Sequence, residues 1–197
     1  MSNNTQQSSG WFTATLAGTK AQPCSFDFAT SKVVCVGRNY AEHAKELNNP
    51  IPNNPLLFIK PNSALISLQE GVNVSISQQP CHYETEIALI LKQPLTAASP
   101  EESLGAIAGI GLGLDLTLRD LQSDLKQKGQ PWEKAKAFDA SCAVSEFISA
   151  KEFPDLANIN FELLINGKRA QIGNSQDMLF PIARLISEAS HYFSLYP

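Results

Sequence analysis

The sequence lacks the features of several large classes of protein. No long run of Lys or Arg occurs, and a net charge of −4 disfavours binding to a nucleic-acid backbone. The uncharged stretch from Ser103 to Leu114 is too short to cross a bilayer. Residues 1–10 are polar, without the basic-then-apolar order of a signal peptide. We therefore expect a cytoplasmic protein that binds neither nucleic acid nor membrane.

Cysteine is scarce, and its spacing excludes two common motifs. The four cysteines are scattered, and no Cys-x-x-Cys pair occurs, so neither a zinc ribbon nor a thioredoxin-like motif is present. A chain of 197 residues can bury a core without disulfides. We expect free, buried thiols at Cys24, Cys35, Cys81 and Cys142.

The composition is that of one globular domain. Hydrophobic residues make up 43% of the chain and charged residues 17%, which argues against a mostly disordered chain. We expect residues 1–10 to form a disordered arm and residues 11–197 to form a single domain.

Hydrophobic patterns and turn signals predict more strands than helices. Apolar or alternating segments typical of strands occur at 32–37, 56–59, 72–76, 82–91, 113–118 and 161–165. Helices are predicted at 40–47, 100–108, 120–128 and 178–192, with Ser99 capping the second and Gly129 ending the third. Asn166-Gly167 is a strong hairpin signal. Many strands with a few separated helices favour an α+β fold over regular βαβ winding.

Three acids in strand-like segments form a candidate metal site. Glu84 and Glu86 are two apart on a predicted strand, so their side chains share a face, with Cα atoms about 6.5 Å apart. Asp115 interrupts another apolar strand, where an acid needs a partner. Three carboxylates favour Mg²⁺, Mn²⁺ or Ca²⁺ over zinc. The alternatives are two solvated glutamates on an edge strand and a turn acid at Asp115.

A second candidate group follows the first predicted strand. His43 and Glu46 are three apart on a predicted helix and share a face, the arrangement of a general base that acts on water. The alternative is a pair on a solvated surface. The loop at 48–55 would let this helix close over a site. Downstream, Arg119 and Lys136 are cations that would hold a substrate carboxylate or protonate an enolate, unless they lie on an exposed amphipathic helix.

Six short motifs occur together in one order, and together they resemble the fumarylacetoacetate hydrolase superfamily. The order is G-R-N-Y-x2-H-x2-E, K-P, H-Y-E-x-E, D-x-T-x-R-D-x-Q, P-W-x3-K-x-F-D and N-G-x3-Q. The likeness runs from about Val33 to the last residue, and it is greatest to the short, single-domain branch that acts on small 2-oxo acids.

The resemblance implies a β-rich mixed roll or sandwich with flanking helices, usually a homodimer. It implies Mg²⁺ or Mn²⁺ as cofactor and assigns the site residues by matching motifs. The metal ligands would be Glu84, Glu86 and Asp115, the catalytic residues His43, Glu46 and Lys136, and the substrate-binding residues Arg38, Tyr40, Lys60, Arg119 and Gln122.

The chain departs from the family pattern in two places. Tyr83 stands where the family usually has a second histidine, and we expect it to face away from the ligands. After the helix at 178–192, family members continue with a core strand and a Thr-Gly-Thr-Pro loop. We therefore expect the last core strand and that loop to be missing from these 197 residues.

The leading hypothesis is a metal-dependent hydrolase that cleaves a C–C bond in acylpyruvate-type 2,4-dioxo acids through a metal-stabilised enolate. The same enolate chemistry allows two enzymatic alternatives, an oxaloacetate decarboxylase or tautomerase and a 2-hydroxymuconate-type isomerase. The non-catalytic alternatives are a truncated, inactive metal-binding remnant and a β-rich binding module without metal.

Overall fold

The computed structural model describes residues 12–16, 32–41, 51–72 and 80–197, and strands dominate them. The strands are β1 (Phe12–Leu16), β2 (Lys32–Gly37), β3 (Leu56–Pro61), β4 (Leu65–Ser67), β5 (Cys81–His82), β6 (Thr85–Leu91), β7 (Ile107–Asp115), β8 (Thr117–Leu118), β9 (Cys142–Val144), β10 (Ile148–Ser149), β11 (Asn160–Ile165) and β12 (Lys168–Asn174). The helices are α2 (Pro100–Gly105), α3 (Arg119–Gln127), α4 (Glu133–Lys136) and α5 (Ile182–Tyr192). The fold is therefore α+β and rich in strands, as the sequence predicts.

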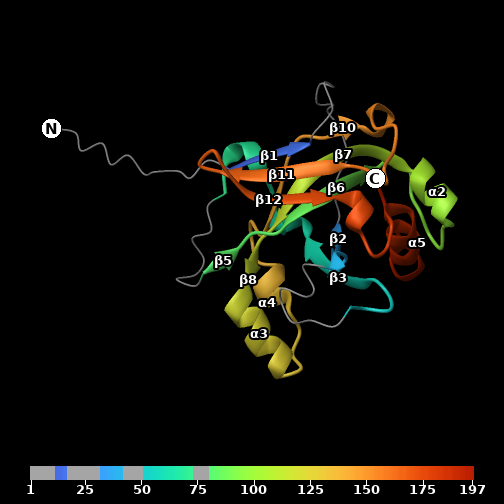
Figure 1. Ribbon diagram of the computed structural model, residues 1–197. Coiled ribbons are helices and arrows are strands. Elements are labelled where there is room, and N and C mark those ends of the chain that lie inside the picture. The colour runs from blue at the N-terminus through green and yellow to red at the C-terminus, as the bar shows by residue number, and fades with distance from the viewer. Residues whose placement is uncertain (1–11, 17–31, 42–50, 73–79) are drawn as a thin grey trace.

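Two sheets pack on each other around β7. The larger sheet has the order β10-β7-β9-β4, and β6 also pairs with β7. The smaller sheet, β1-β11-β12, is antiparallel and lies across β6 and β7 (Figure 1). Leu163 of β11 packs with Leu114 and Ala143 of the larger sheet, so an apolar layer joins the two. The pairs β2–β3 and β5–β8 complete the described strands.

The helices lie in two separate groups (Figure 1). Helices α2 and α5 pack beside the larger sheet, where Ile182, Ile186 and Ala189 of α5 join Ile107 of β7 in one buried cluster. Helices α3 and α4 lie next to β8 and bury Leu125 and other apolar side chains of their own. No helix in the described ranges combines the length and apolar character needed to cross a membrane.

Several predicted elements are confirmed with their chemistry. Strand β2 has the predicted bounds, and β3 extends two residues beyond its predicted end. Asn166 and Gly167 both have positive φ, 52° and 73°, as a two-residue hairpin turn requires. Ser99 forms a capping box with Glu102 at the start of α2. The predicted segments at 1–10, 42–47 and 73–76 lie outside the described residues.

Four predictions about the extent of helices and strands are wrong. The helix predicted at 100–108 ends at Gly105, and the following strand begins at Ile107, six residues earlier than expected. The glycines of this strand, β7, permit close packing, since a Cβ at Gly111 would lie 3.0 Å from the Ser145 hydroxyl oxygen. Helix α5 begins at Ile182 because Pro181 restricts the residue before it. The strand predicted at 82–91 is interrupted at Tyr83 and Glu84.

Candidate active site

The site begins where β6 and β7 meet. Thr85 at the start of β6 pairs with Leu114 near the end of β7, so Glu84 and Asp115 lie side by side just beyond this pair. The Asp115 amide donates a 2.8 Å hydrogen bond to the Glu84 carbonyl oxygen. Strand register therefore brings together two acids that are 31 positions apart in the sequence.

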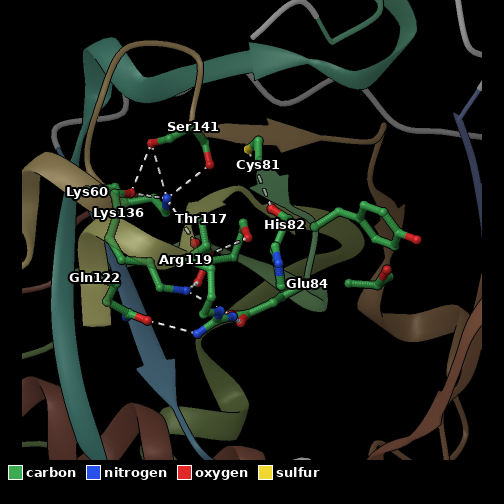
Figure 2. A network of polar contacts seen from close by, with 12 residues as sticks. Lys60, Cys81, His82, Glu84, Thr117, Arg119, Gln122, Lys136 and Ser141 are labelled. Carbon is green, nitrogen blue, oxygen red and sulfur yellow. Dashed lines mark hydrogen bonds and ion pairs between the residues drawn. The ribbon is translucent and has the colours of Figure 1, made fainter. Parts of the chain in front are cut away.

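Lys136 joins the two carboxylates. Its Nζ lies 2.8 Å from Glu84 Oε2 and 2.6 Å from Asp115 Oδ2 (Figure 2). The side chain ends helix α4 and is 5% exposed. Burial disfavours the charged ammonium, but the charges of Asp115 and Glu84 outweigh it and raise the pKa of Lys136 above its ordinary value. Lys136 is therefore a protonated cation at neutral pH, close to both acids as predicted.

Lys60 is the largest fully buried side chain among the described residues, and protein groups surround its ammonium. Its Nζ lies 2.9 Å from Asp115 Oδ1 and donates to the Ser141 carbonyl at 2.9 Å and hydroxyl at 3.1 Å, and to the Lys136 carbonyl (Figure 2). These contacts tie β3 to Asp115 and to the loop after α4. The substrate contact assigned to Lys60 remains a prediction, since these internal groups already use its donors.

Arg119 and Gln122 lie on the other side of Glu84. The Arg119 guanidinium pairs with Glu84 Oε1 and donates from Nη1 to Gln122 Oε1 at 2.8 Å (Figure 2). Gln122 is 3% exposed, so the first turn of α3 faces the site. The exposed-helix alternative is wrong for Gln122, although the polar remainder of α3 faces solvent.

Two more of the predicted residues, Glu86 and Tyr40, line a cavity of about 340 Å³. Glu86, Tyr40, Lys60 and Asp115 line this cavity together with apolar side chains from β2, β6 and α5. The Tyr40 hydroxyl is buried and has no hydrogen-bond partner within the described part of the chain. Burial, with the charges of Glu86 and Asp177, raises the pKa of Tyr40 above its ordinary value. Arg38 follows β2 with φ of 57°.

The donor chemistry suits a hard cation, but the predicted trio is incomplete. Among the described residues, no group of three or more His, Cys, Asp or Glu side chains is placed to hold a metal ion. The carboxylates of Glu84 and Asp115 both contact Lys136 Nζ, so they converge on one position that a cation occupies. Asp115 Oδ1 accepts no well-aligned hydrogen bond from the described residues. Carboxylate oxygens that already share a cation fit Mg²⁺ or Mn²⁺. Glu86 stays a predicted third ligand.

Two further predictions have different outcomes. His43 and Glu46 lie outside the described residues, so their pairing stays a prediction. Tyr83 packs against the cluster of Leu114 and Leu163.

The described thiols are free as the sequence predicts, but only Cys142 is buried, whereas Cys35 and Cys81 are partly exposed. Cys35, Cys81 and Cys142 are free, whereas Cys24 lies outside the described residues. Burial raises the pKa of Cys142 to about 11. These cysteines are therefore neutral thiols at neutral pH.

Sequence reasoning missed two residues that hold the site. Ser141 accepts hydrogen bonds from Lys60, and no charge or motif signal distinguishes it in the sequence. Gln171 hydrogen-bonds the backbone on both sides of Glu84. Its signal was the N-G-x3-Q motif, to which no chemical role was assigned.

The β-rich fold, with acids of two strands gathered around cations, is that of one enzyme family. The family model described as fumarylacetoacetate (FAA) hydrolase C-terminal matches residues 32–197, so the chain belongs to this family.

The curated relatives include several tautomerases. The chain is 46% identical over 175 residues to oxaloacetate tautomerase YcgM of Escherichia coli (strain K12), covering 88% of this chain and 80% of that protein. It is 39% identical to the mitochondrial oxaloacetate tautomerase FAHD1 of Bos taurus, covering 83% and 74%.

Solved structures agree in fold. A putative fumarylacetoacetate hydrolase family protein from Yersinia pestis CO92 is 48% identical with a TM-score of 0.84, covering 87% of this chain and 79% of that one. Fumarylpyruvate hydrolase from Pseudomonas aeruginosa, in complex with Mn²⁺ and pyruvate, is 27% identical with a TM-score of 0.78, covering 92% and 82%.

These likenesses change the order of the functional hypotheses. Relatives of high identity are oxaloacetate tautomerases, whereas the hydrolase of known ligands is more distant. The chain is an enzyme-family member related to proteins that act on small oxo acids. The oxaloacetate alternative therefore fits better than acylpyruvate hydrolysis.

Proposed function

We propose that this protein is a divalent-metal-dependent oxaloacetate tautomerase, which exchanges the enol and keto forms of that acid. The observation that carries the proposal is the shared cationic point between Glu84 and Asp115, at 2.8 and 2.6 Å from Lys136 Nζ. The 46% identity to an oxaloacetate tautomerase supports the choice of substrate.

Glu84 and Asp115, with Glu86 from the same cavity wall, would hold Mg²⁺ or Mn²⁺. Such an ion, when bound, supplies Lewis-acid stabilisation of the negative charge that develops on the substrate's 2-oxygen. The Mn²⁺ in the related fumarylpyruvate hydrolase supports this choice of cofactor.

The charge balance of the site favours a substrate with two carboxylates. Glu84 and Asp115 pair with Lys60, Arg119 and Lys136, and Glu86 lines the cavity beside Lys60 and Asp115. These three acids and three cations together carry a formal charge of zero. Adding a divalent cation creates an excess of two positive charges. A dicarboxylate dianion such as oxaloacetate restores neutrality, which buried charges require.

The protein side chains divide the remaining work. In ketonisation a proton must leave the 2-hydroxyl and another must join C3, so one O–H bond breaks and one C–H bond forms. The proton from the 2-hydroxyl passes to water, and Lys136, which is protonated, can donate a hydrogen bond to the 2-oxygen that is left behind. We assign the proton transfer at C3 to the His43–Glu46 pair and binding of the distal carboxylate to Arg119, which Gln122 orients.

The test follows the loss of enol absorbance of oxaloacetate, using the full chain with Mg²⁺ or Mn²⁺ and with a chelator. The expected result is acceleration over buffer that needs the metal and that Glu84→Gln removes. Lys128→Met, at an exposed ion pair on α3, is the matched control and should retain full rate.

Two parallel assays separate the alternatives. Acetylpyruvate cleavage without enol exchange would establish the hydrolase, and pyruvate release from oxaloacetate would establish the decarboxylase. Metal-dependent thermal stabilisation without any turnover would contradict the proposal and favour a binding remnant.

A further inference from the structure

The backbone that carries Glu84 has lost its regular strand partners. Strand β5 ends at His82 and β6 starts at Thr85, so Tyr83 and Glu84 lie between the two ladders. On one side, Asp115 N–H still donates to the Glu84 carbonyl. On the other side, the Tyr83 carbonyl and the Thr85 amide face away from β7 and need partners.

The side-chain amide of Gln171 supplies both partners. Its Oε1 accepts from Thr85 N at 3.0 Å and from Thr85 Oγ1 at 2.5 Å, and its Nε2 donates to the Tyr83 carbonyl at 3.1 Å. The amide orientation is fixed, because Thr85 N–H can only donate and the carbonyl can only accept. One side chain thus replaces the donor–acceptor pair of a missing strand on both sides of Glu84.

A bulge in β12 places Gln171 for this role. The register of β11 and β12 pairs Leu163 with Gln171 but Leu164 with Arg169, so Ala170 is an extra residue. Such a bulge turns the following side chain out of its regular direction. Gln171 belongs to the smaller sheet, which runs beside β6 (Figure 1), so its bonds also fix one sheet against the other. Thr85 is buried, which shields the bonds from water.

We propose that Gln171 is a positioning residue, which holds the peptide groups around Glu84 so that its carboxylate stays aimed at the cation point. This inference rests on the proposed role of Glu84 in binding a divalent metal. Gln171 acts through Glu84, because its amide is bonded to the backbone and not to the charged cluster.

The test compares Gln171→Met, which removes both hydrogen-bonding functions at similar volume, with Gln171→Glu, which keeps the acceptor and loses the donor. Gln176→Met, at an exposed position five residues later, is the matched control. Mn²⁺ affinity is measured by calorimetry, and exchange of the Thr85 amide proton is measured by NMR on the metal-free protein.

Gln171→Met should weaken Mn²⁺ binding about tenfold or more, as loss of an outer partner of a metal ligand typically does. Gln171→Glu should fall between this variant and the native protein. The Thr85 amide should exchange faster in Gln171→Met only. If Gln171→Met does not fold, Gln171→Glu carries the comparison.

Three results would overturn the inference. The first is an Mn²⁺ affinity within twofold of native in both variants. The second is unchanged exchange of the Thr85 amide proton in Gln171→Met, and the third is a native chain that binds no Mn²⁺. Native Mn²⁺ binding that depends on Gln171, without enol exchange, would uphold the positioning role while refuting the tautomerase.

Discussion

At the scale of single residues, Lys60 of β3 contacts several groups of the site at once. Lys60 has no exposed surface, and its ammonium bonds to one carboxylate, two carbonyls and one hydroxyl. A buried ammonium with this many acceptors is compensated, but removing it leaves the Asp115 carboxylate and the carbonyls without their partner.

Lys60→Met is therefore expected to lower the free energy of unfolding by about 3 kcal/mol, as breaking a buried ion pair from one side does. Urea denaturation measures the change. Lys128→Met removes a lysine whose side chain is 57% exposed and should cost less than about 0.5 kcal/mol. Equal stability of the two variants would show that Lys60 does not fix the site.

Residue types in the sequence pointed to Glu84, Asp115, Arg119 and Lys136, and the family resemblance added Lys60, but neither showed how these charges pair. Asp115 in an apolar strand required a partner, and the structure supplies Lys136 and Lys60. The identity of these partners depends on tertiary packing of α4 and β3 against β7. Ser141 and Gln171 carry no charge, so no electrostatic argument from the sequence could select them.

At the scale of elements, local chemistry predicted turns, caps and the longer strands, but not the strands β1, β4, β9 and β10. The Asn166-Gly167 turn and the Ser99 cap act within a few residues, and both are confirmed. One of the failures has a tertiary cause. The strand predicted at 82–91 breaks at Glu84 because the backbone groups on either side of this residue bond to Gln171 of another sheet. This contact joins residues far apart in the chain.

Strand β12 offers a prediction about packing. A Cβ at Gly173 would overlap the ring of Phe161, its partner in β11, and this ring is buried and cannot move aside freely. Gly173→Ala should therefore cost about 1–3 kcal/mol of stability, measured by thermal or urea unfolding.

Gly105 provides the control for this prediction. It ends helix α2, and no heavy atom lies within 4 Å of the Cβ it would gain, so Gly105→Ala should leave stability unchanged or slightly higher. A Gly173→Ala protein as stable as native would mean that β11 and β12 pack more loosely than described.

At the scale of the whole molecule, the described segments enclose a cavity whose walls are mostly apolar and whose charged end is the site. Strand β2, an apolar run in the sequence, is only half-buried because it pairs with β3 and faces this cavity of about 340 Å³. Hydrophobicity alone predicted a strand there, but it could not show whether protein or a cavity covers it. Asp115 and Glu86 line this cavity together with Lys60.

In the proposed metal site, Glu84, Glu86 and Asp115 gather around one divalent ion, although Lys136 Nζ lies between two of them in this structure. A crystal structure of the full chain grown with Mn²⁺, with anomalous scattering to locate the metal, tests this most directly. We predict one anomalous peak coordinated by all three carboxylates, with Lys136 Nζ displaced from its point between Glu84 and Asp115. Mn²⁺ bound elsewhere, or no peak while Lys136 still bridges the two acids, would contradict the account.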